Sequence, residues 1–133
     1  MATLEKKLSL LSEMISFSII DGKLHKSEYG FISLVAIELG IEKNLLDSLF
    51  QNEIKPQQLV NEIGRIQQFY RLALLMHIDG ILHEKEDNSL HEIGIKMGLN
   101  PQAMNTVLKL MKQNKNCILD AKVLFKTFDA QHN

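Results

Sequence analysis

One nine-residue segment occurs twice in the chain, and this repeat constrains the fold more than any other feature. Residues 20–28 read Ile-Asp-Gly-Lys-Leu-His-Lys-Ser-Glu, and residues 78–86 read Ile-Asp-Gly-Ile-Leu-His-Glu-Lys-Glu. The offset is 58 residues, the separation of Asp21 from Asp79. A whole segment repeated in one register predicts two equivalent structural units in tandem.

The repeat extends beyond this segment. Gly40 and Gly98 lie at the same offset, each followed by Ile or Leu, and no gap is needed between the motif and these glycines. A length of 133 residues suits one compact domain rather than two. We therefore predict a single domain built from two homologous helical halves at about 4–55 and 62–113, linked by a helix at 56–63 and followed by a C-terminal helix at about 117–129.

The spacing of apolar residues predicts an all-α fold. One stripe advances in steps of three and four residues and stops at Asp21-Gly22: Leu4, Leu8, Leu11, Ile15 and Ile19. Comparable stripes recur along the chain, strict alternation over more than four residues is absent, and nine Gly and Pro residues are few for a sandwich or barrel. We expect seven to eight helices, Gly40 in a left-handed cap, and a linking helix that ends or bends near Gly64.

Charge and cysteine content restrict the function. Fifteen Lys and Arg against sixteen Asp and Glu leave no basic excess for binding nucleic acid. The single Cys117 forms no internal disulfide, which fits a reducing compartment. The most apolar internal stretch, 72–78, is shorter than the ~20 residues that cross a bilayer. We expect a cytoplasmic protein without a transmembrane segment, and peripheral membrane association stays open.

The repeated Asp-Gly-x-Leu-x-x-x-Glu motif resembles the second half of a calcium-binding EF-hand loop. Such a loop also requires oxygen ligands two and four residues before its Asp. Those positions hold Ile19 and Phe17 in the first copy, and His77 and Leu75 in the second. Neither copy alone therefore supplies a calcium cage.

Helix capping is a second interpretation of the same residues. Glu28 and Glu86 follow His25 and His83 by three residues, the distance at which a carboxylate reaches back to a free backbone N–H. Capping explains the Gly and Glu of each motif. It explains Asp less well, because a negative charge at a helix C-terminus opposes the helix dipole.

Two copies of this motif, each between an apolar helix and a helix that ends in Gly-Ile or Gly-Leu, resemble the TerB-like domain family. The resemblance covers about residues 8–128. It implies a compact all-α fold of about seven helices made by duplication, and a stress-response role in tellurite-resistance systems with binding of divalent metal through acidic residues. The matching positions are Asp21, Glu28, Asp79 and Glu86. His25 and His83 depart from the family, which has a small hydroxyl residue there.

A pseudo-two-fold axis between the halves would bring the two Asp-Gly loops together. Four carboxylates facing one another repel unless a cation or protons intervene. The expected cofactor is a divalent metal ion: Ca²⁺, Mg²⁺ or Mn²⁺ with oxygen ligands alone, and Zn²⁺, Mn²⁺ or Fe²⁺ if His25 and His83 contribute. His77, one turn before Gly80, is a weaker additional candidate.

Enzyme activity is not expected, and no catalytic residue is assigned. Neither half holds the Glu-x-x-His pair of di-iron bundles, and no phosphate-binding Gly loop or nucleophile motif occurs. The alternative function is a small helical adaptor without metal, whose acidic residues serve as caps and which binds a protein partner or itself. Acidic residues near the second motif and lysines in the last helices support this alternative.

Overall fold

The computed structural model describes residues 3–20, 22, 24–52, 59, 61–78, 84–114 and 116–130. Within these ranges the chain forms helices and no strands, so the predicted all-α class is confirmed. The helices are α1 (Leu4–Ser18), α2 (Lys26–Glu38), α3 (Lys43–Leu49), α4 (Glu62–His77), α5 (Glu84–Lys96), α6 (Pro101–Gln113) and α7 (Ala121–Ala130).

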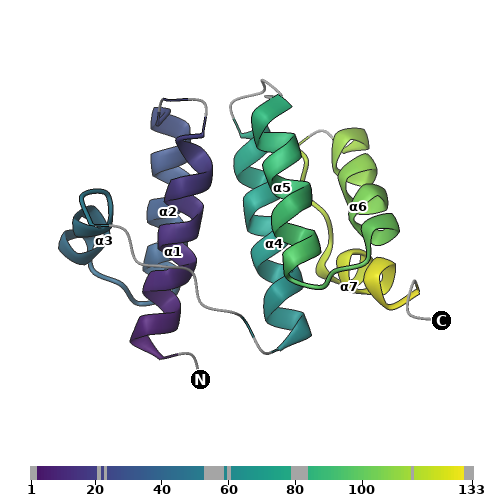
Figure 1. Cartoon of the computed structure of the whole chain (residues 1–133), viewed down its shortest axis with the longest axis horizontal. Helices are drawn as coiled ribbons and strands as arrows, with labels where there is room; N and C mark the ends of the chain where they lie inside the picture. The colour runs from purple at the N-terminus through teal and green to yellow at the C-terminus, as the bar shows by residue number, and fades with distance from the viewer. Residues whose placement is uncertain are drawn as a thin grey trace.

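Two antiparallel helix pairs stand side by side in the centre of the molecule (Figure 1). One pair is α1 with α2, and the other is α4 with α5. Helix α1 contacts α2, α3, α4 and α5, and α6 packs on α5 and on α7. In Figure 1, α3 flanks the first pair on the left, while α6 and α7 flank the second pair on the right.

The core is one apolar cluster shared by the helices. The stripe predicted for the first helix supplies Leu11 and Ile15, and Met14 is buried beside them, each at most 2% exposed, whereas Leu4 and Ile19 at the ends of the stripe are exposed. Helix α4 contributes Phe69, whose ring meets that of Phe128 from α7 edge to face with centroids 6.1 Å apart. Helices with apolar residues on more than one side are buried on more than one side, which is why α1 and α4 occupy the centre.

Glycines end α2 and α5 in the same way. Gly40 and Gly98 have φ values of +75° and +81°, the left-handed region that glycine adopts without a steric penalty. The residue after each glycine donates its N–H to a carbonyl five residues earlier: Ile41 to Ala36 (2.8 Å), and Leu99 to Gly94 (3.0 Å). This is the Schellman cap, and the prediction for Gly40 is confirmed.

The predicted linking helix is wrong at its C-terminal boundary. Asn61 is extended and caps α4 through its side chain, which accepts from the N–H of Ile63 at 2.7 Å. Helix α4 then continues through Gly64 without a break. Residues 56–58 and 60 of the predicted 56–63 helix lie outside the described residues, and residues 59 and 61 are not helical.

The last helix begins later than predicted. Residues 118–120 are not helical, and α7 starts at Ala121 with the Asp120 carboxylate accepting from Lys122 N–H (2.8 Å). Tyr70 explains the delay, because its hydroxyl accepts from Leu119 N–H at 2.7 Å and holds this non-helical segment against α4. None of the helices in the described ranges is long and apolar enough to cross a membrane.

Candidate functional site

The helix ends that flank the two Asp-Gly motifs lie at the same end of the molecule. In Figure 1, α1 and α4 both finish at the top, and α2 and α5 both start there. Gly22 has a φ of +92°, as a chain reversal after α1 requires. Asp21, Asp79 and His83 themselves lie outside the described residues.

Glu28 is a capping residue of α2. It occupies the third position of the helix, its Oε1 accepts from the backbone N–H of His25 at 3.0 Å, and His25 is the N-cap. The side chain of Glu28 is 2% exposed. Burial of a carboxylate is tolerated here because a helix N-terminus presents unpaired N–H groups and a positive dipole end. The capping role predicted for Glu28 is confirmed.

Glu86 is buried to the same degree on α5. It is also 2% exposed and is also the third residue of its helix. We call each Asp-Gly motif, together with the helix ends that flank it, a corner. A buried glutamate therefore lies at each of the two corners, in the first turn of α2 or of α5. His77, near the end of α4, is half-buried, and burial and the charge of Lys112 lower its pKa, while Asp87 opposes this change. A lowered pKa favours the neutral imidazole that binds metals.

No group of three or more metal-binding side chains converges within the part of the chain that the structure describes. Asp21 and Asp79 fall outside that part, so the predicted set of Asp21, Glu28, Asp79 and Glu86 stays a prediction. What the structure does provide is two buried carboxylates, one at each corner, on helices that start from the same end of the bundle.

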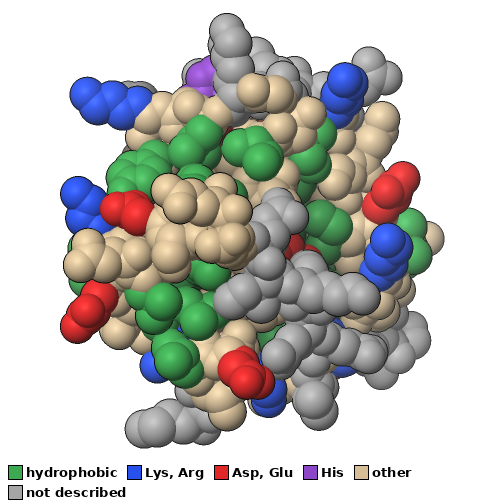
Figure 2. Space-filling view, turned by 60° about the vertical axis from the view of Figure 1, so that its left-hand side comes forward, with side chains coloured by type: hydrophobic (Ala, Val, Ile, Leu, Met, Phe, Trp, Pro, Cys, Tyr) green, Lys and Arg blue, Asp and Glu red, His purple; other side chains and the backbone are tan. Residues whose placement is uncertain are grey.

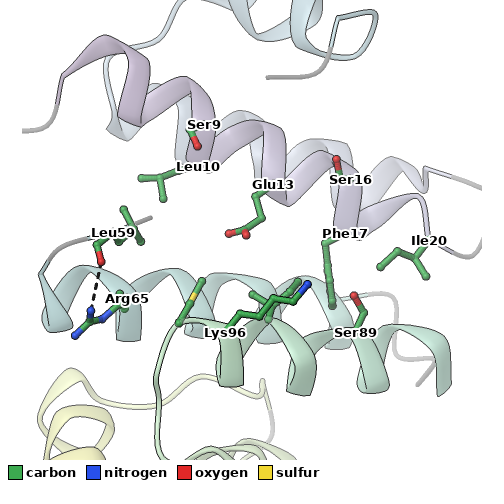
Figure 3. Close-up of a pocket in the computed structure, with 12 residues that line it drawn as sticks. Ser9, Leu10, Glu13, Ser16, Phe17, Ile20, Leu59, Arg65, Ser89 and Lys96 are labelled. Atoms are coloured by element: carbon green, nitrogen blue, oxygen red, sulfur yellow. Dashed lines mark hydrogen bonds between the residues drawn. The ribbon is translucent and has the colours of Figure 1, made fainter. Parts of the chain in front are cut away.

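A cavity of about 640 Å³ opens between α1, α4 and α5 (Figure 3). The spacing of residues in the sequence does not predict this cavity. Its apolar lining includes Phe17 and Ile93, and three charged side chains also border it: Glu13, Arg65 and Lys96. Figure 3 shows the carboxyl group of Glu13 pointing from α1 into the space above α4 and α5.

A buried glutamine holds Glu13 in place. Gln68 is fully buried, and its side-chain N–H groups donate to Glu13 Oε1 (3.0 Å) and to the carbonyl of Leu10 (3.1 Å). Its carbonyl accepts from Arg71 Nη1 at 3.3 Å. Burial raises the pKa of Glu13, and the hydrogen bond from Gln68 partly opposes that change. Burial also lowers the pKa of Arg71, against the opposing charge of Glu38.

One sequence signal could have revealed this network. Gln68 interrupts the apolar stripe of α4, between Ile66 and Phe69, where a long polar side chain needs a buried partner. The spacing alone did not identify that partner, because Glu13 lies 55 residues away.

Comparisons with models of protein families, with curated proteins and with solved structures find no match to this chain.

Proposed function

We propose that the chain is a non-enzymatic, TerB-like domain that binds a divalent cation where its two Asp-Gly corners meet. The observation that supports this proposal is the common location of the helix ends that flank the two motifs, since α1 and α4 end, and α2 and α5 begin, at one end of the bundle (Figure 1). The proposed ligands are Asp21, Glu28, Asp79 and Glu86. The proposed setting is a stress response of the tellurite-resistance type.

Matching helix bounds support the underlying duplication. Helices α2 and α5 begin at Lys26 and Glu84 and end at Glu38 and Lys96, so both bounds differ by the 58-residue offset of the motif. Helices α3 and α6 begin at the same offset, and the Schellman caps of α2 and α5 repeat it as well. Equal bounds in two segments are expected when both descend from one ancestral unit.

A contact between α1 and α4 supports a two-fold relation between the halves. Gln68 donates to the carbonyl of Leu10, and these two positions are themselves 58 residues apart. In a two-fold arrangement, equivalent positions meet each other only at the axis. An axis between α1 and α4 would place the two corners side by side at the top of the bundle.

The capping bond of Glu28 is compatible with ligation. A carboxylate has two oxygens with about four acceptor sites, so Oε1 can accept from His25 N–H while the group also approaches a cation. A bound cation would also offset the cost of keeping two acidic loops and two buried glutamates at one end of the molecule.

Calorimetric titration tests the proposal. Ca²⁺, Mg²⁺, Mn²⁺ and Zn²⁺ are titrated into the wild-type protein and into Asp21→Asn, Asp79→Asn and, as a control, Glu92→Gln, which changes an exposed carboxylate of α5. At least one cation should bind to the wild type and to the control, and each Asp variant should weaken its binding about tenfold or more. Equal isotherms for all four proteins would reject the site.

The second candidate function is an interaction module without metal. Leu34 and Ile37 on α2 are 64% and 71% exposed, and Ile95 on α5 is 59% exposed. Figure 2, which turns the α3 side of the molecule forward, shows hydrophobic side chains at several places on that surface, separated by polar and charged ones. Sedimentation of the wild type and of Leu34→Ser/Ile37→Ser tests self-association, which the double substitution should abolish if these side chains form the interface.

A further inference from the structure

We propose that the cavity between α1, α4 and α5 binds a small, uncharged hydroxyl compound, with its apolar body between α1 and α5 and its hydroxyl group donating to Glu13. The volume of about 640 Å³ falls in the range of small-molecule sites in proteins. This proposal does not rest on the proposed cation site, since the described lining includes neither Glu28 nor Glu86.

The apolar lining selects the body of the ligand. Phe17 lies near the end of α1 and Ile20 just after it, whereas Ile93 belongs to α5 and Met97 directly follows that helix. Figure 3 shows the ring of Phe17 pointing from α1 toward α5. An aromatic ring or a short aliphatic chain in this space would remove apolar surface of both helices from water.

The charged lining residues disfavour a charged ligand of either sign. In Figure 3 the carboxyl group of Glu13 lies between the guanidinium group of Arg65 on one side and the amino group of Lys96 on the other. The guanidinium group is turned to Leu59, whose carbonyl accepts from Nη1 at 3.4 Å. An anion in the middle of the cavity would meet the acid, and a cation at either end would meet a base. An uncharged ligand meets neither repulsion.

Glu13 supplies the acceptor for the hydroxyl group. Its Oε1 accepts from the fully buried Gln68 at 3.0 Å, and Gln68 accepts in turn from Arg71, so the carboxyl group has a fixed position in the cavity wall. Its Oε2 forms no hydrogen bond within the described residues. A hydroxyl group can donate to this oxygen whether the carboxyl group is ionised or protonated, so the proposal does not depend on the charge of Glu13.

The test uses four probes built on one phenyl ring with one attached carbon atom: benzyl alcohol, benzyl methyl ether, benzoate and benzylammonium. Each is titrated at pH 7 into ¹⁵N-labelled protein, and binding is followed by the shifts of backbone amide signals. Benzyl alcohol should give saturable shifts at α1 and α5. The ether should bind about fivefold or more weakly, although it is the more apolar molecule, because it lacks the donor. Both charged probes should also bind more weakly than the alcohol.

Glu13→Gln tests the role assigned to the carboxyl group. The amide oxygen can still accept from Gln68, which places the amide N–H₂ group, a donor, where Oε2 was. The variant should therefore lose the preference for benzyl alcohol over benzyl methyl ether. Glu5→Gln, which changes an exposed carboxylate of the same helix outside the cavity lining, is the matched control and should keep that preference. Asp79→Asn should also keep it, which separates this site from the proposed cation site.

The proposal is overturned by any of four results. They are the absence of saturable shifts with benzyl alcohol, binding of the ether to the wild type as tight as that of the alcohol, tighter binding of either charged probe, and an unchanged preference for the alcohol in Glu13→Gln.

Discussion

The helices of the segment α1–α3 and those of the segment α4–α6 begin at positions 58 residues apart, but the two segments differ in their charges. At the 58-residue offset, Glu13 on α1 corresponds to Arg71 on α4, and Glu38 on α2 corresponds to Lys96 on α5. In both comparisons the first segment has an acidic residue where the second segment has a basic one. The cavity with Glu13 and Lys96 is thus a place where the two segments differ, whereas Glu28 and Glu86 at the corners are a place where they agree.

This comparison separates two kinds of position. Positions that set backbone geometry hold the same residue type in both segments, as Gly40 and Gly98 do. Some positions that line the cavity hold opposite charges in the two segments, as Glu13 and Arg71 do.

Replacing the buried glutamates tests whether the two corners are equivalent in structure. These substitutions should give the largest change in the free energy of unfolding. Glu28→Ala should lower the free energy of unfolding by about 2 kcal/mol, because it removes the acceptor for His25 N–H and leaves a buried gap. Glu86→Ala should cost a similar amount. Glu28→Gln should cost less, since the amide oxygen still accepts this bond. Urea unfolding measures all three, and a negligible cost at Glu86 would show that the two corners differ in structure.

The helix contact at position 94 is a second difference between the segments. A methyl group on Gly94 would collide with Met104 Sδ and come within 3.3 Å of Phe69, whereas the corresponding Ala36 of α2 is accommodated. Gly94→Ala should therefore destabilise the protein by about 1 kcal/mol despite the better helix propensity of Ala.

A double variant sharpens this result. Gly94→Ala/Met104→Leu gives the second segment the residue types of Ala36 and Leu46 in the first segment, and the shorter side chain makes room for the methyl group. It should recover the stability lost by Gly94→Ala, measured as the urea midpoint. A double variant that is less stable than Gly94→Ala would contradict the proposed equivalence of the two segments.

The raised pKa of Glu13 predicts the smallest change in the free energy of unfolding, and this change depends on pH. An acid whose pKa is raised above its ordinary value of 4.5 on folding gives stability that is full below that value and is lost as pH rises through the folded pKa. Glu13→Gln cannot ionise and keeps an acceptor for Gln68. It should therefore be more stable than the wild type at pH 7, by less than about 1 kcal/mol. A difference in urea midpoints that does not change between pH 4 and pH 7 would contradict this.

Local patterns predicted most of the helices but not how they are joined. The apolar stripe of α1 and the cap at Gly40 depend on residues close in sequence, so periodicity identified them. The start of α7 was wrong because Tyr70, far away in the chain, holds Leu119 out of the helix. Pairings between distant residues leave no periodic signal.

The candidate sites show the same difference between contacts of nearby residues and contacts of distant residues. The capping role of Glu28 was predictable, because donor and acceptor are three residues apart. The cavity was not, because Glu13, Gln68 and Lys96 come together only when α1, α4 and α5 pack. That the two Asp-Gly loops face each other stays a prediction from the repeat, whereas the helix ends that flank them lie at one end of the bundle because of the way the whole chain packs.

Paramagnetic broadening by Mn²⁺ tests the shared cation site most directly. A substoichiometric amount of Mn²⁺ is added to ¹⁵N-labelled protein, and the loss of each amide signal reports its proximity to the ion. If one ion lies between the corners, signals at the start of α2, such as Glu28, and at the start of α5, such as Glu86, should broaden together and recover together with excess Mg²⁺. Broadening at one corner alone, or at neither, would contradict the account.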